Sequence, residues 1–213
     1  MRRRTAVLIS GRGSNLAALL RTAADPAYPA AISLVISNRA DAAGIAHAAT
    51  AGVPVRVIEH QPYRGDRVAH ETAINAALRE ADIELVCLAG YMRLLSGFLV
   101  DAWTGRMLNI HPSLLPAFPG LHTHARALAA GVKLHGCTVH LVTLATDGGP
   151  VLAQAAVPVL AGDTEASLAA RVLAQEHVSY PLALRLLASG RAGQPASAAA
   201  ALCNPLPATE PVA

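Results

Sequence analysis

The first half of the chain alternates short apolar runs with segments whose apolar residues recur at helical spacing. The apolar runs predict strands at residues 5–10, 31–37, 53–58, 84–89 and 106–110, and the segments between them predict helices at 14–24, 43–51, 66–81 and 96–103. The strand runs are apolar almost throughout, which is typical of a sheet covered on both faces. Strands that alternate with helices predict a mostly parallel sheet with right-handed crossovers.

The pattern changes after residue 130. Two β-rich runs, 134–143 and 151–159, flank the turn sequence Asp147-Gly148-Gly149-Pro150, which predicts an antiparallel hairpin. A long helix is then predicted from Thr164, its N-cap, to about Leu187. We therefore expect a single α/β domain over residues 1–190. It should be a Rossmann-like open twisted sheet, mostly parallel with an antiparallel C-terminal part, and with helices on both faces. Residues 191–213 are rich in Ala and Pro and are expected to form an irregular or disordered tail.

Composition narrows the class of protein. The 213 residues are 53% hydrophobic and 15% charged, which favours a globular domain. A net charge of +3 is too small to indicate a nucleic-acid partner, and no apolar run is long enough to span a membrane. The three cysteines, Cys87, Cys137 and Cys203, are widely spaced, which favours a reducing cytoplasm.

The loop after the first strand, SGRGSNL at residues 10–16, carries two glycines and opens a helix. Such a loop can hold an anion on unpaired backbone N–H groups. Leu16 stands where a dinucleotide fingerprint has its third glycine, and the second strand ends in Ser37-Asn38 without an acid. Two interpretations remain open: a site for a single phosphate, or a tight turn in which Ser14 caps the helix.

The fifth predicted strand ends in Asn109-Ile110-His111-Pro112. Side chains two apart share one face of a strand, so Asn109 and His111 can point to one site at its carboxyl end. An amide donor beside an imidazole suits acyl transfer, because one group stabilises an oxyanion and the other moves protons. Asp147 is either a turn residue or, if its loop folds over this strand end, a carboxylate that favours the charged form of His111.

A metal site is not predicted. His122, His124, His135, His140 and Cys137 are close in sequence, but their spacing matches no familiar zinc site. Ser113 lacks the glycine-flanked turn of an activated nucleophile.

Six segments, in order over about residues 5–190, resemble the phosphoribosylglycinamide formyltransferases of the formyltransferase family. They are VLISGRGSNL, LAGYMRLLS, LNIHPSLLPAFPGLHTH, HGCTVHLV, DGGPVLAQ and RVLAQEHVSYP. The resemblance implies that the amine of glycinamide ribonucleotide attacks the formyl carbon of 10-formyltetrahydrofolate directly, through a tetrahedral intermediate. It implies that Asn109 donates to the oxyanion, His111 mediates proton transfer and Asp147 tunes His111, without a metal or a covalent enzyme intermediate.

The resemblance also implies the binding residues. The ribonucleotide would contact Gly13, Ser14, Asn15 and Glu176, although Glu176 could also be an exposed helix acid. The folate would contact Arg67, Met92, Arg93, Leu94, Leu95 and Asn109, with residues 143–147 against the pterin. Arg64 is the alternative to Arg67 for the glutamate tail of the folate.

We therefore expect a cytoplasmic enzyme with small-molecule substrates, no nucleic-acid or membrane partner, and a monomeric or homodimeric state. Methionyl-tRNA formyltransferase and formyltetrahydrofolate hydrolase share the strand-end motif but carry an added domain, which the short tail and early first strand disfavour here. A phosphate-binding module without catalysis would need the first loop but not Asn109, His111 and Asp147.

Overall fold

The chain forms one seven-stranded sheet in the order β3-β2-β1-β4-β5-β6-β7. The computed structural model describes residues 1–192, and the rest of the predicted tail, with Cys203, lies outside the described residues. The strands are β1 Arg3–Ile9, β2 Ala30–Ser37, β3 Val55–Val57, β4 Leu85–Leu88, β5 Met107–His111, β6 Leu134–Leu141 and β7 Val151–Pro158. The first five pair in parallel and the last two are antiparallel, as predicted.

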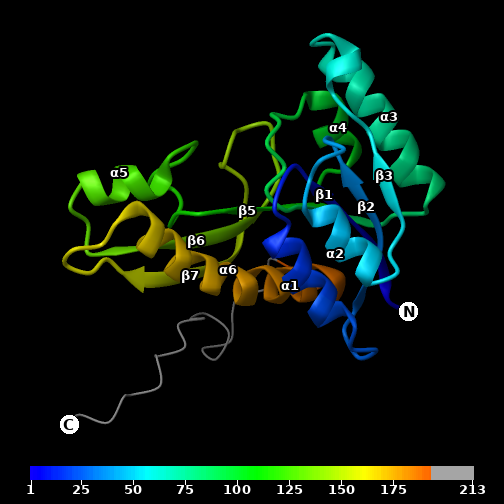
Figure 1. Ribbon diagram of the computed structural model, residues 1–213. Coiled ribbons are helices and arrows are strands. Elements are labelled where there is room, and N and C mark those ends of the chain that lie inside the picture. Colours follow the sequence, from blue (N-terminus) through cyan, green and yellow to red (C-terminus); the bar gives the residue numbers. More distant parts are fainter. Residues whose placement is uncertain (193–213) are drawn as a thin grey trace.

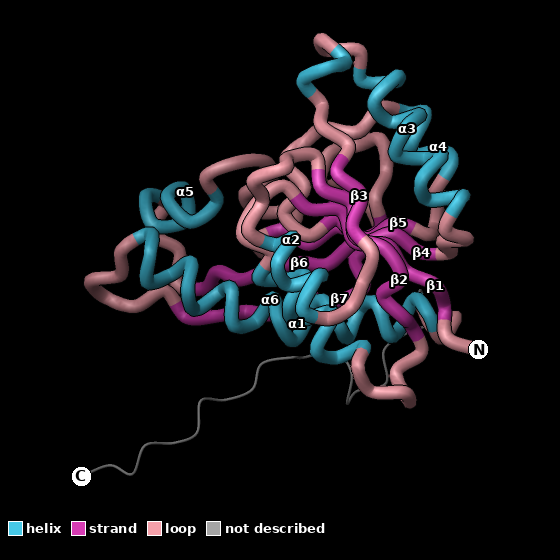
Figure 2. The backbone as a smooth tube through the Cα atoms, turned by 45° about the vertical axis from the view of Figure 1, so that its right-hand side comes forward, coloured by secondary structure: helices cyan, strands magenta, loops and turns pink. Residues whose placement is uncertain are grey.

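Helices cover both faces of the sheet (Figures 1 and 2). They are α1 Ser14–Ala23, α2 Gly44–Thr50, α3 Arg67–Glu80, α4 Gly97–Ala102, α5 Thr123–Ala129 and α6 Glu165–Ala188, with a short 3₁₀ helix η1 at Gln61–Tyr63. Alternate residues of β1 serve the two layers: Val7 and Ile9 pack with α1, α2 and α6, whereas Ala6 and Leu8 pack with α3 and α4. This two-sided burial explains why the strand runs are apolar without alternation.

A third core layer lies under the β6–β7 hairpin. Ala127 of α5 and Cys137 of β6 pack there against Leu168 and Val172 in the first half of α6. Figure 1 shows α6 continuing from this hairpin to the side of α1. The sequence pattern did not predict α5, because this helix has only seven residues, of which only Thr123 and Ala127 are buried.

Two helix starts test the predicted caps. Thr164 caps α6 as predicted, since its side chain accepts a hydrogen bond from the Ser167 N–H and Ser167 returns one. The interpretation in which Ser14 caps α1, one of the two left open for this loop, is wrong. The N-cap is Gly13, at φ 74°, and its left-handed conformation is one that glycine adopts without strain. Ser14 is instead the first helical residue.

The strand order places β1 between β2 and β4, so the chain switches direction across the sheet there. Ligands of open α/β sheets bind at the carboxyl ends of the strands beside such a switch. The segments that follow β1 and β4 meet at this point, where the backbone N–H of Met92 donates to Ser10 Oγ at 2.9 Å. None of the helices in residues 1–192 has the length and apolar character needed to cross a bilayer.

Candidate active site

Asn109 and His111 lie at the carboxyl end of β5 and point to the same side of the sheet. The residues between and before them, Ile110 and Leu108, pack into the layer under α1 and α6. The two polar side chains therefore face away from that layer. The structure thus has the strand-end geometry that the sequence predicts, with His111 itself still within β5.

The imidazole ring of His111 lies between two oxygen atoms. Its Nε2 lies 3.0 Å from the carbonyl oxygen of Phe118, and its Nδ1 lies 3.4 Å from Oδ2 of Asp147. A carbonyl oxygen only accepts, so Nε2 carries a proton. A proton gained at Nδ1 would face the carboxylate directly. The two side chains are 8% and 9% exposed, so bulk water screens this pair only weakly.

Asp147 connects two loops above the strand end. Its Oδ2 also accepts a hydrogen bond from the Gly120 N–H at 2.9 Å, which joins the loop after β5 to the loop between β6 and β7. The residue has a left-handed backbone, with φ 53°, a conformation that Asp tolerates better than most residues. Asp147 is therefore both a turn residue and a neighbour of His111.

His140 belongs to this cluster, although the sequence suggested it only as a metal ligand. It pairs with Asn109 across the β5–β6 ladder. Burial lowers the pKa of His140, so the ring is neutral near pH 7. Its Nδ1 donates to the Leu141 carbonyl at 2.9 Å, which leaves Nε2 to accept from Nδ2 of Asn109 at 3.3 Å. The second amide hydrogen of Asn109 has no partner among the described residues and can bind a ligand.

The turn after His111 is held from β6. Thr138 lies opposite His111 in the ladder, donates to the Ser113 carbonyl at 2.7 Å and accepts from the Leu115 N–H at 3.0 Å. The Ser113 side chain is buried and donates to the Ala117 carbonyl at 2.6 Å. Ser113 therefore stabilises the turn, and its hydroxyl is not available as a nucleophile.

The first glycine loop packs closely on the start of α2. The Gly44 N–H donates to the Gly11 carbonyl at 2.9 Å. A Cβ atom on Gly13 would lie 2.5 Å from the Cα of Gly44, which real structures do not allow. Both the left-handed conformation and this contact require glycine at position 13.

Asn15 and Glu176 join the first loop to α6. Nδ2 of Asn15 donates to Oε2 of Glu176 at 2.7 Å, and Glu176 is only 8% exposed. The alternative of an exposed helix acid is therefore wrong. Burial raises the pKa of Glu176, while the Asn15 hydrogen bond and the charges of His111 and Arg12 lower it. Glu176 is thus within electrostatic reach of both the first loop and the end of β5.

Residues 92–95, the predicted folate segment, present an apolar and unpaired stretch of chain at the same edge. Met92 and Leu94 are 66% and 64% exposed. Among the described residues, the backbone N–H and C=O groups of Arg93, Leu94 and Leu95 have no hydrogen-bond partner. Leu144, 67% exposed, lies beside Gly97 at the start of α4. The loop of residues 143–147 and the segment of residues 92–95 are therefore neighbours.

The choice between Arg67 and Arg64 is not decided by the contacts. Arg67 is the first residue of α3, and Arg64 follows η1 with φ 49°. Both are exposed. Arg67 as the contact for a folate glutamate tail stays a prediction.

The histidines that were considered as metal ligands lie at two separate places in the structure. His124 and His135 lie together, with Nδ1 and Nε2 3.2 Å apart, whereas His140 belongs to the Asn109 cluster. Within residues 1–192, no three side chains of His, Cys, Asp or Glu gather as a metal ion would need.

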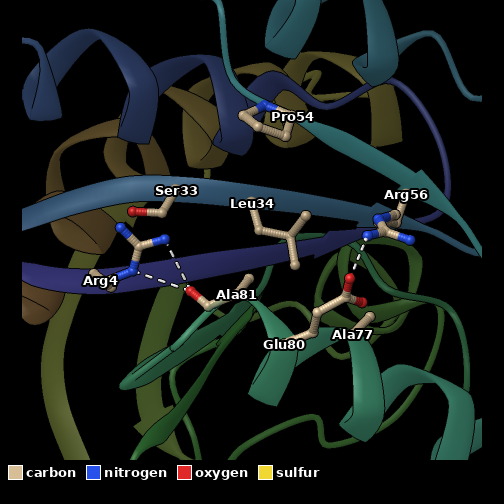
Figure 3. A pocket seen from close by; sticks show the side chains of 8 residues that line it. All are labelled: Arg4, Ser33, Leu34, Pro54, Arg56, Ala77, Glu80 and Ala81. Atoms are coloured by element: carbon tan, nitrogen blue, oxygen red, sulfur yellow. Dashed lines mark hydrogen bonds and ion pairs between the residues drawn. The ribbon is translucent and has the colours of Figure 1, made fainter.

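A pocket of about 230 Å³ lies at the opposite, amino edge of the sheet (Figure 3). Its two arginines are already paired: Arg4 donates to the Ala81 carbonyl at 2.9 and 3.0 Å, and Arg56 meets Glu80 at 3.1 Å. Its arginine side chains are already bound within the protein and it lies at the wrong end of the strands, so this pocket is not the candidate site.

Comparison with known proteins matches residues 3–184 to the formyl transferase family. The chain is 52% identical over 187 residues to the human trifunctional purine biosynthetic protein adenosine-3, covering 88% of this chain but 18% of that protein. It is 45% identical over 188 residues to phosphoribosylglycinamide formyltransferase of Escherichia coli, covering 87% of both chains. The crystal structure of phosphoribosylglycinamide formyltransferase from Brucella melitensis is 57% identical, with a TM-score of 0.85 over 89% of this chain and 97% of that one.

These matches cover the sheet, the first loop and the end of β5 together, so they extend to every part of the candidate site. The chain belongs to the formyl transferase family, in its phosphoribosylglycinamide formyltransferase branch.

Proposed function

We propose that this protein transfers the formyl group of 10-formyltetrahydrofolate to the amine of glycinamide ribonucleotide, a step of purine biosynthesis. The observation that carries the proposal is the convergence of Asn109, His111 and Asp147 at the carboxyl end of β5. Asp147 lies 3.4 Å from Nδ1 of His111 and 3.8 Å from Nε2 of His140, and His140 in turn lies 3.3 Å from Nδ2 of Asn109. An amide, an imidazole and a carboxylate in one place fit acyl transfer.

The reaction that these groups support is direct. The amine nitrogen attacks the formyl carbon, and the free N–H of Asn109 donates to the oxygen as it becomes negative. His111 takes part in moving the proton that the amine loses to the nitrogen of the departing tetrahydrofolate. Asp147 stabilises the imidazolium form while His111 holds that proton.

The first loop and α6 supply a site for the ribonucleotide. The glycine loop opens α1, whose first N–H groups suit a phosphate. Oδ1 of Asn15, the other polar atom of the amide that donates to Glu176, is buried without a partner in residues 1–192. A buried acceptor of this kind fits a ligand hydroxyl, which a ribose provides.

The segment of residues 92–95 supplies a site for the folate. Its unpaired backbone groups can bind the donors and acceptors of a pterin, and the exposed side chains of Met92, Leu94 and Leu144 can cover its faces. Arg67 would meet the glutamate tail. The proposed chemistry uses no metal. A single formyltransferase domain over residues 1–190, working in the cytoplasm as a monomer or homodimer, completes the proposal.

The test is a formyl-transfer assay on the purified protein, with and without EDTA. We expect formylglycinamide ribonucleotide and tetrahydrofolate in equal amounts, at the same rate with EDTA. Formate release that does not depend on the ribonucleotide would indicate a hydrolase instead. Ribonucleotide binding without any formylation would indicate a binding module, and inactivation by EDTA with rescue by zinc would overturn the metal-free chemistry.

Gly13→Ala is expected to raise the KM for glycinamide ribonucleotide about tenfold or more. The added Cβ would meet Gly44 at 2.5 Å, so the loop must move away from the phosphate position. Gly52→Ala is the matched control, because Gly52 has a similar φ of 67° with nothing near its Cβ. Both variants should lose roughly 1 kcal/mol of stability from backbone strain. Equal KM values in the two variants would contradict this role of Gly13.

A further inference from the structure

We infer that Glu71 is the positioning residue of the folate segment, holding residues 92–95 in the conformation that binds the co-substrate. This inference rests on the proposed function. Glu71 lies on α3 and is not one of the residues assigned to binding above, yet it is 1% exposed. A fully buried carboxylate needs specific partners, and a search for those partners leads to the folate segment.

Both carboxylate oxygens of Glu71 bind the same residue. Oε1 accepts a hydrogen bond from the Ser96 N–H at 2.8 Å, and Oε2 accepts one from the Ser96 hydroxyl. Ser96 is the N-cap of α4 and directly follows Leu95. Its hydroxyl makes no capping bond to α4, because it is turned toward Glu71 instead. The carboxylate therefore fixes the exact point where the folate segment ends.

The other end of the segment is fixed in the same way. The Met92 N–H donates to Ser10 Oγ at 2.9 Å, and Ser10 is 7% exposed at the end of β1. Between these two attachments, the backbone of Arg93 to Leu95 has no hydrogen-bond partner in the described residues. The segment is thus a bridge held at both ends, and its shape depends on the two buried side chains rather than on bonds of its own.

In this arrangement the residues that hold the folate segment in place are different from the backbone groups that would bind the folate. Unpaired backbone groups bind a ligand well only if they are already in the binding conformation, because ordering a mobile segment costs affinity. Arg67, proposed to meet the glutamate tail, lies one helical turn before Glu71 on α3. The same helix would therefore set the position of both the pterin contacts and the tail contact.

The test compares Glu71→Ala with Glu80→Ala. Glu80 lies on the same helix but is exposed and paired with Arg56, so its variant controls for loss of a carboxylate from α3. We expect Glu71→Ala to raise the KM for 10-formyltetrahydrofolate at least tenfold, with the KM for glycinamide ribonucleotide within about twofold of wild type. The dissociation constant for tetrahydrofolate, measured by calorimetry, should rise by the same factor. Glu80→Ala should match wild type in all three.

Ser96→Ala provides a second variant if Glu71→Ala does not fold. It removes the hydroxyl bond but keeps the N–H bond to Glu71, so a smaller rise in the folate KM, about threefold, is expected, again without change for the ribonucleotide. Folded variants that leave the folate KM unchanged, or that raise both KM values equally, would overturn the inference. A wild-type protein without formyl transfer would instead refute the proposed function, whatever these variants do.

Discussion

His111→Ala is expected to lower kcat by on the order of 10²-fold or more while the protein stays folded, as loss of an acid–base group usually does. In the proposed reaction the imidazole is the acid–base group, and it is held with Nδ1 3.4 Å from Asp147 and Nε2 3.0 Å from the Phe118 carbonyl. His140, the other imidazole of the cluster, has both ring nitrogens engaged by Leu141 and Asn109, so we do not expect it to replace His111 in proton transfer. The measurement is steady-state formyl transfer, with circular dichroism and thermal unfolding as the test of folding.

His60→Ala is the matched control for this variant. His60 lies near the ends of β2 and β3, where Nδ1 contacts Asn38, and it has no place in the proposed chemistry. Its variant should keep wild-type turnover. Partial recovery of His111→Ala by added imidazole would support proton transfer as the lost step. A folded His111→Ala protein with turnover within a few-fold of wild type would rule out the assigned role.

Much of the fold follows from the sequence because burial on two faces leaves a clear local signal. Each strand of the parallel part is an apolar run, and each of the first four runs is followed by a segment with helical spacing. The exceptions are elements whose stability is not local. α5 has seven residues and follows His122, its N-cap, which has a left-handed conformation, so it depends on packing against β6 and α6. The apolar pattern of so short a segment, even with its alanine content, could not distinguish this helix from a loop.

The candidate catalytic cluster was only partly predictable for a related reason. Asn109 and His111 are two apart on one strand, so sequence spacing alone places them on one face. Asp147 comes from a loop about 36 residues later in the chain. The turn sequence left its association with His111 as one of two interpretations, and only the family resemblance favoured it. The ladder register sets the pairing of His140 with Asn109. A register is a property of two strands together, so neither strand carries it alone.

Glu176 shows the same limit for binding residues. In the sequence Glu176 is an acidic residue beside His177 on a predicted helix. An acidic side chain on a helix is ordinarily expected to be exposed. In the structure α6 crosses close to α1, so the carboxylate is buried against Asn15. The environment of Glu176 is set by the contact between two helices that are far apart in the sequence. The burial that this contact produces also raises the pKa of Glu176. Sequence reasoning finds the residue only by resemblance, and the packing supplies the physical reason.

Asn109→Ala is the second variant with a large expected effect: a fall in kcat on the order of 10²- to 10³-fold, or about 2.7–4 kcal/mol, as for other oxyanion donors. The free amide hydrogen of Asn109 is aimed by the bond from its other hydrogen to Nε2 of His140 at 3.3 Å. In the proposed mechanism the donor acts on charge that develops only in the transition state, so the KM values should change much less than kcat.

The contact between His140 and Asn109 allows a second test of this prediction. If His140 acts by orienting Asn109, then His140→Ala should lower kcat by itself, but adding it to Asn109→Ala should cost little more. Such non-additivity is expected when two residues act as one unit. Asn75→Ala is a matched control, because its Oδ1 accepts from the Trp103 indole under α4 and it has no contact with the cluster. Fully additive losses, or a folded Asn109→Ala protein with near-normal turnover, would contradict the proposed roles of this pair.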